Sequence, residues 1–189
     1  MRLKSLLIAL LISICNINAQ EFTEWSTTSY ESGITPDCSQ TSPEYSDSLN
    51  NFLRIKVGAN TDVIVRLMRI GEPKDVCIRS VYVKSNESYE MRQIPEDVYY
   101  IKIAYGKDYR EKNDSTGCIG KFFINQHFEK SKDLMDFTRA KQADRIIDGK
   151  KHEVWHLPTY EIFLDASELM LDDKKTMNNN RISEQEFNK

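Results

Sequence analysis

The histidines are the residues whose type and spacing come closest to metal or catalytic chemistry. His152 and His156 lie four residues apart, the spacing at which two imidazoles on one face of a helix can bind zinc. Pro158 follows closely and the surrounding pattern favours an extended strand, so we expect no zinc site here. His127 stands alone in the sequence. We therefore expect no metal and no other cofactor.

Carboxylates are the next candidates for chemistry. Pairs such as Glu96 and Asp97 are numerous in the sequence. Glycosidase-type acid–base catalysis, however, needs two carboxylates that face each other across a cleft, and adjacency in sequence does not indicate this. The sequence has no Gly-x-Ser-x-Gly nucleophile motif, no phosphate-binding loop and no dinucleotide fingerprint. These observations predict a protein that is not an enzyme. A small secreted hydrolase is an alternative, and it requires two or more of the three histidines to converge with carboxylates.

The cysteines point to a structural role. Cys38, Cys77 and Cys118 follow the N-terminal region, and none forms a Cys-x-x-Cys pair. One disulfide is expected in an exported protein, which leaves one thiol free, and three pairings are possible. Cys38 is favoured as a member of the bridge because its Pro/Ser/Thr-rich segment has little else to anchor it.

Residues 1–19 have the pattern of a secretory signal. Arg2 and Lys4 precede an apolar run over residues 6–14 that is too short to span a bilayer, and cleavage is expected after Ala19. Lipid attachment at Cys15 is the alternative. We expect an exported protein, in the periplasm, associated with the outer membrane or extracellular, that does not span a membrane. The formal net charge of −3 argues against nucleic acid as a partner.

Alternating apolar residues predict an all-β fold. Residues 52–57, 61–70, 76–84, 89–94 and 98–105 read as strands, and further strands are expected near 118–125, 128–138 and 160–164. The charged stretch 107–117 is expected to be an exposed loop, and Asp148-Gly149-Lys150 a turn. The pattern predicts an antiparallel Greek-key β-sandwich of about seven to eight strands.

The expected domain organisation follows from these elements. Residues 49–168 form the sandwich, and residues 20–48 form an extended N-terminal arm anchored by Trp25 and Tyr30. Residues 169–189 are polar and are expected to be disordered.

One segment resembles a known family. Residues 89–106 (YEMRQIPEDVYYIKIAYG) are similar to the prealbumin-like, carboxypeptidase-regulatory-type and PEGA-like β-sandwich domains, in which an Ile-Pro-x-Gly turn connects two strands. Here Asp97 stands where those families usually have Gly. The resemblance implies a scaffold that serves for docking or as a spacer and implies no activity. The end of the signal also resembles those of Bacteroidota proteins.

Two groups of side chains are candidate contact or modification sites. An exposed row of Tyr82, Tyr99, Tyr100 and Tyr105 would make a surface for a protein or a glycan. Ser48 and Ser115 lie in short motifs that resemble O-glycosylation sites of exported Bacteroidota proteins. The sequence therefore predicts a binding or docking module, an accessory subunit of a cell-envelope or surface complex. A carbohydrate-binding module that uses exposed aromatic rings is the alternative.

Overall fold

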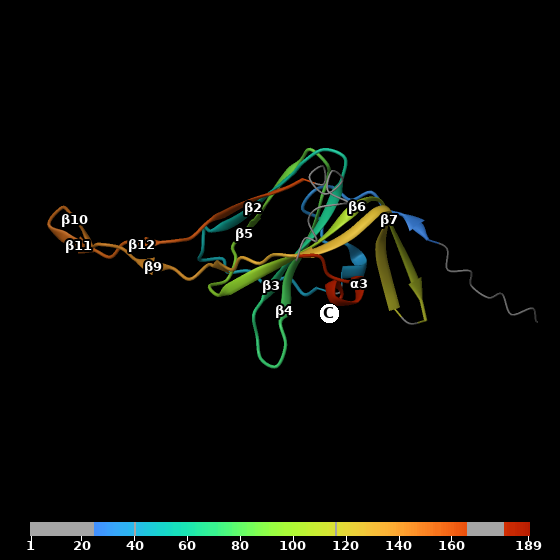
Figure 1. The fold of residues 1–189 in the computed structure, drawn as a ribbon. Coiled ribbons are helices and arrows are strands. Elements are labelled where there is room, and N and C mark those ends of the chain that lie inside the picture. The colour runs from blue at the N-terminus through green and yellow to red at the C-terminus, as the bar shows by residue number, and fades with distance from the viewer. Residues whose placement is uncertain (1–24, 40, 116, 166–179) are drawn as a thin grey trace, which may run out of the picture.

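The computed structural model describes residues 25–39, 41–115, 117–165 and 180–189. The expected signal, with Cys15, lies outside this part of the chain. Two packed β-sheets form the body, a narrow ribbon extends away from it, and a short C-terminal helix lies against one sheet (Figure 1). The predicted all-β, sandwich-like class is confirmed.

The small sheet has three strands. β2 (Phe52–Val57) lies between β5 (Ser88–Arg92) and β13 (Tyr160–Leu164). β5 is antiparallel to β2, whereas β13 runs parallel to it, which differs from the wholly antiparallel pairing that the sequence suggested. Leu53 and Ile55 are fully buried, while the intervening Arg54 is paired with Glu90 at the surface, as the two-residue period of a half-buried strand requires.

The large sheet has six strands in the order β1-β6-β3-β4, with β7 and β8 also paired to β6. Their bounds are Ser26–Thr27 for β1, Asp62–Arg69 for β3, Val76–Val83 for β4, Val98–Asp114 for β6, Gly117–Lys130 for β7 and Met135–Asp136 for β8. One face packs on the small sheet and builds the main core with side chains such as Val63, Val65 and Leu67. The other face, here called the outer face, carries Ile64 and Tyr82.

Segments from both ends of the chain cover the outer face. From the N-terminal arm, Tyr30 packs into a second apolar cluster, and η1 (Asp37–Ser39) carries buried Cys38. From the C-terminus comes α3 (Glu184–Phe187), whose Phe187 is buried in the same cluster. Both faces of the large sheet are therefore covered, and the molecule has a third layer beyond the two sheets.

The stretch 107–117, expected to be a loop, forms most of a long hairpin instead. β6 continues to Asp114, and β7 returns from Gly117 to Lys130, so that it contains the predicted strand 118–125 and only the first three residues of the predicted strand 128–138. The reason is the covered outer face, where Tyr109 and Glu111 are buried while Asp108 and Arg110 pair with each other on the opposite side. The charged residues alternate with buried ones, so the stretch is a strand.

Part of the expected disordered tail is also a folded element. Residues 180–189, here called the C-terminal segment, run beside β7 and then form α3. Ser183 caps α3 by accepting a hydrogen bond from the Glu186 amide, and Phe187 is buried. Two apolar residues, Ile182 and Phe187, hold this otherwise polar segment on the sheet.

The connection between β5 and β6 contains the residues that carried the family resemblance. Pro95, Glu96 and Asp97 lie in this connection, as expected. The residue with left-handed backbone is Gln93 (φ 60°), and Asp97 is not one of the described residues with positive φ. The Gly position of the family pattern therefore has no left-handed counterpart at Asp97.

Candidate functional site

The row of tyrosines predicted as a contact surface is buried. Tyr82, Tyr99, Tyr100 and Tyr105 are each less than 5% exposed, and each hydroxyl donates to an internal acceptor. Tyr99 donates to the Pro95 carbonyl at 2.9 Å, and burial raises its pKa to about 12. The prediction was wrong because both faces of the large sheet are covered. The carbohydrate-binding alternative loses the observation on which it rested.

The histidines do not come together. His127 lies on β7, stacked on Tyr105 with 4.4 Å between ring centroids, whereas His152 and His156 are exposed on the ribbon. In the part of the chain that the structure describes, no group of three or more His, Cys, Asp or Glu side chains could hold a metal ion. The convergence that the hydrolase alternative requires is not found among these residues.

The three cysteines that the structure describes form one bridge, between Cys38 and Cys118, and leave Cys77 free. Cys38 is thus a member of the bridge, as predicted, and it ties the N-terminal arm to the start of β7. The Cys77 thiol lies 3.4 Å from the Thr41 hydroxyl, and burial raises its pKa. It is therefore protonated at neutral pH and is a poor nucleophile.

Ser48 and Ser115, the predicted O-glycosylation positions, are both exposed in turns. Their hydroxyls are open to a modifying enzyme, and the modification itself stays a prediction.

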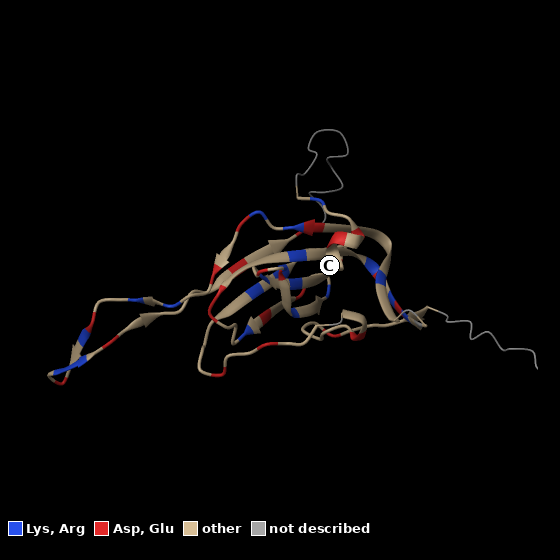
Figure 2. Cartoon of the chain, turned by 90° about the horizontal axis from the view of Figure 1, so that it is seen from below, with Lys and Arg blue, Asp and Glu red and all other residues tan. Residues whose placement is uncertain are grey.

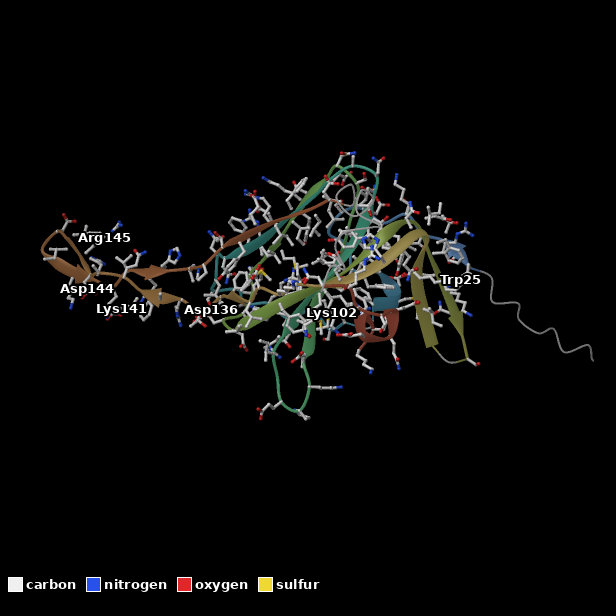
Figure 3. The ribbon with its side chains drawn as sticks, viewed as in Figure 1. Trp25, Lys102, Asp136, Lys141, Asp144 and Arg145 are labelled. Carbon is white, nitrogen blue, oxygen red and sulfur yellow. A yellow bond between two sulfur atoms is a disulfide. The ribbon has the colours of Figure 1, made fainter. Side chains whose placement is uncertain are left out.

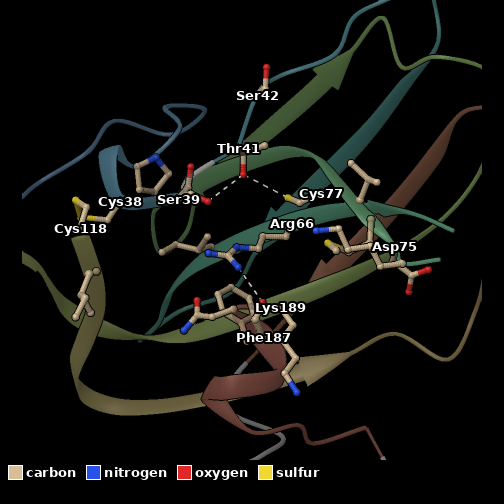
Figure 4. A pocket seen from close by; sticks show the side chains of 18 of the residues that line it. Cys38, Ser39, Thr41, Ser42, Arg66, Asp75, Cys77, Cys118, Phe187 and Lys189 are labelled. Carbon is tan, nitrogen blue, oxygen red and sulfur yellow. Dashed lines mark hydrogen bonds between the residues drawn. A yellow bond between two sulfur atoms is a disulfide. The ribbon is translucent and has the colours of Figure 1, made fainter. Parts of the chain in front are cut away.

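A groove lies on the outer face, bounded by the arm, the sheet and the end of α3 (Figure 4). It encloses about 620 Å³, and Cys77, Arg66, Thr41 and Phe187 line it. The Arg66 guanidinium is over the Phe187 ring, 4.2 Å from its centroid, and donates to the Phe187 carbonyl at 2.8 Å. Burial lowers the pKa of Arg66.

Lys102 lies close to this groove and is 5% exposed. Its ammonium donates to the Glu186 carbonyl at 2.6 Å. Burial, followed by the charges of Lys130 and Arg66, lowers its pKa. Two desolvated cations on the outer face are thus held by main-chain carbonyls of the C-terminal segment.

The ribbon, residues 139–156, is the second candidate and the more accessible one. Its four short strands are β9 (Ala140–Lys141), β10 (Arg145–Ile147), β11 (Lys150–His152) and β12 (Trp155–His156). In the described part of the chain they pair only within the ribbon, β10 with β11 and β12 with β9. The predicted turn is found at Asp148 and Gly149, which both have positive φ, whereas Lys150 already belongs to β11. The ribbon therefore extends away from the body without a covering layer (Figures 1 and 3).

The base of the ribbon is fixed to the body. Phe137 is fully buried between Tyr99 and Tyr160, and its amide donates to the Asp97 carbonyl at 2.9 Å. Arg139 pairs with Glu96 at 2.9 Å. These contacts set the direction in which the ribbon leaves the body.

Several large apolar side chains of the ribbon are exposed to solvent. Ile146 and Ile147 are 78% and 53% exposed, and Trp155 is 45% exposed farther down. Arg139 and Lys141 lie 5.5 and 5.9 Å from the Trp155 ring centroid. Exposed apolar residues gathered on one projecting element indicate an interaction site.

The charge of the ribbon differs from that of the whole chain. Residues 139–156 hold five Lys and Arg residues and three Asp and Glu residues, in a chain whose formal net charge is −3 (Figure 2). Lys151 pairs with Asp144 at 2.7 Å, and Lys141 pairs with Glu153, so the pairs hold the two strands together. Arg145 and Lys150 flank the apolar tip in sequence. The sequence signalled this element only through its charge and its turn.

Comparisons with protein-family models, with curated proteins and with solved structures gave no match. Among the described residues, none of the helices has the length and apolar character needed to cross a membrane.

Proposed function

We propose that this protein is a non-catalytic docking module that binds another protein through the ribbon. The observation that carries the proposal is the exposure of Ile146 and Ile147 at the tip of an element that is fixed at its base. A two-stranded hairpin buries little of its own surface and is only marginally stable alone. A partner that covers the tip removes this apolar area from water, which is the main favourable term in association.

The side chains and strand edges of the ribbon indicate which properties a partner surface must have. Ile146 and Ile147 are consecutive in β10 and therefore point to opposite faces of the ribbon. A groove with two apolar walls would accept them both, and an acidic rim would face Arg145 and Lys150. The unpaired edges of β10 and β11 offer main-chain groups for strand addition. The partner we propose is therefore a protein with an apolar groove that has an acidic rim and an exposed strand edge.

The setting we propose is the cell envelope or surface. The signal pattern of residues 1–19 and the Cys38–Cys118 bridge support export, since disulfides persist in oxidising compartments. The resemblance of residues 89–106 to prealbumin-like and PEGA-like domains of Bacteroidota supports an accessory role in a larger complex.

The test compares two variants of the full chain in affinity purification from envelope extracts, followed by binding measurements with the purified partner. Ile146→Ser with Ile147→Ser removes the apolar tip, and Phe163→Ser, at a residue 66% exposed on the small sheet, is the matched control. We expect the tip variant to bind at least about tenfold more weakly, equal to about 1.4 kcal/mol, with the control unchanged. Equal binding by both variants would refute the proposal.

A further inference from the structure

We infer that the outer face of the large sheet is a peptide-binding site and that the C-terminal segment is the peptide it holds. This site is separate from the ribbon and does not depend on the function proposed above. Its ligand class is a linear peptide that pairs with β7 as a strand and inserts an aromatic side chain beneath Arg66.

The first element of recognition is strand addition at β7. The Lys130 amide donates to the Asn180 carbonyl at 2.9 Å, and the Ile182 amide donates to the Phe128 carbonyl at 3.1 Å. Between them, Arg181 forms an antiparallel bridge with Glu129. Main-chain pairing of this kind gives affinity that does not depend on the peptide's side chains.

The second element is a pair of apolar side chains five positions apart. Ile182 packs against the apolar cluster of the outer face, and Phe187 is buried within it, 5.1 Å from the Phe128 ring. The turn of α3 between them brings both to the same surface. The spacing of an aliphatic residue and an aromatic one therefore specifies which peptides fit.

The third element is a pair of cationic side chains that donate hydrogen bonds to main-chain carbonyls of the segment. Arg66 donates to the Phe187 carbonyl and Lys102 to the Glu186 carbonyl. These contacts require a helical turn with its carbonyls facing the sheet and make no demand on the side chain at position 186. A peptide of different sequence can meet them.

The hydrogen bonding between the C-terminal segment and the sheet is incomplete, which favours replacement of the segment by another peptide. Within the described residues, two buried side-chain atoms at this contact have no hydrogen-bond partner: Arg66 Nε on the sheet and Asn180 Oδ1 on the segment. Unpaired buried groups offset the gain from burying Phe187. In addition, the main core between the two sheets contains no residue of the C-terminal segment. The body is therefore expected to keep its fold when the segment leaves.

Covalent attachment explains how a weak ligand can still occupy the site. The segment belongs to the same chain as the sheet that it covers, and covalent linkage of a ligand can give an effective concentration on the order of millimolar. A partner peptide must bind tightly enough to outweigh this effective concentration if it is to displace the C-terminal segment. A peptide that also pairs with Arg66 Nε would make a hydrogen bond that the C-terminal segment does not make, and the segment would then act as an internal competitor.

The experiment uses the full chain with a specific protease site inserted between residues 165 and 180. After cleavage, a fluorescent synthetic peptide of residues 180–189 is added, and its anisotropy reports binding. We expect saturable binding to the cut protein and at least tenfold weaker apparent binding to the uncut protein. A peptide with Phe187→Ala should bind at least tenfold more weakly.

Variants of the cut protein identify the site. Arg66→Gln should weaken peptide binding, and Arg54→Gln, on the exposed side of the small sheet, is the matched control. Circular dichroism of the cut protein follows the fold of the body. Lack of peptide binding by a folded cut protein, equal binding of the Phe187→Ala peptide, or unfolding on cleavage would each overturn the inference.

Discussion

Arg66 contacts Phe187 twice, with its guanidinium 4.2 Å from the ring centroid and with a 2.8 Å hydrogen bond to the carbonyl of the same residue. The two residues are 121 positions apart in the chain. One side chain of a central strand thus fixes both the ring and the main chain of the C-terminal segment. The stability of the outer face is therefore linked to the segment's position.

Replacement of Phe187 tests this link. Phe187→Ala should release the C-terminal segment with little change in the main core, since that core contains none of the segment's residues. Hydrogen exchange should become faster at the Lys130 and Ile182 amides, whose acceptors lie across the contact. Exchange in β3 should stay as in the wild type, and Phe163→Ala, at an exposed position, should change neither. Unchanged protection at Lys130 would contradict the account.

The Cys38–Cys118 bridge should contribute substantially to stability. It closes a loop with a sequence separation of 80 and fixes the arm on the outer face. Cys38→Ser should lower the free energy of unfolding by roughly 2–5 kcal/mol, because the unfolded chain gains freedom. Denaturant unfolding measures the loss, with Cys77→Ser as the control for a cysteine outside the bridge. A loss as large for Cys77→Ser as for Cys38→Ser would argue against this role.

Glu111 should be the main polar anchor of the arm. Its carboxylate accepts from the Tyr30 hydroxyl at 2.8 Å, the Cys38 amide at 3.1 Å and the Tyr109 hydroxyl at 3.2 Å. Glu111→Gln keeps the shape of the side chain but places an amide donor opposite one of these three donors. We therefore expect the free energy of unfolding to fall by about 1–3 kcal/mol. Thermal unfolding of this variant and of Glu161→Gln, which changes an exposed carboxylate, gives the comparison. Similar small losses in both variants would show that Glu111 does not anchor the arm.

His127 should make stability depend on pH. Burial lowers its pKa below the ordinary value of 6.5, so the unfolded chain takes up a proton before the folded one does. The free energy of unfolding should therefore fall as the pH drops through about 6.5 and should be fully retained above it. Urea unfolding at pH 7.5 and pH 5.5 measures the change.

Two variants test whether His127 is the source of this pH dependence. His127→Gln should reduce it, whereas His152→Gln, on the exposed ribbon, should leave it as in the wild type. If His127→Gln retained the whole dependence, another group would be its source. Carboxyl groups with lowered pKa, such as Asp75 and Asp136, act in the same direction at lower pH.

The sequence predicts the strands of the main core well because their periodicity is strict. Leu53, Ile55 and Val57 alternate with charged residues, and all three are buried as expected. The same reasoning failed for Tyr82 and Tyr100, because a sandwich pattern does not reveal that terminal segments cover the outer face. Their hydroxyls reach Asp62 and Asp75, partners that no spacing in the sequence indicates.

The candidate sites were harder to predict because both involve segments that bury few apolar residues. The C-terminal segment has only Ile182 and Phe187 as apolar contacts, too few to signal a docked element. The ribbon has little buried surface, so the usual alternation of buried and exposed residues is absent. Its charge and its turn at Asp148 and Gly149 were the features that the sequence indicated.

The most direct test of the docking function is site-specific photocrosslinking in the full chain in its native envelope. A benzophenone amino acid in place of Ile146 reports on the ribbon tip, and the same group in place of Phe163 reports on an exposed position of the small sheet. The account predicts that one partner protein crosslinks from position 146 and is not recovered from position 163. Absence of a product at position 146, or the same products from both positions, would contradict it.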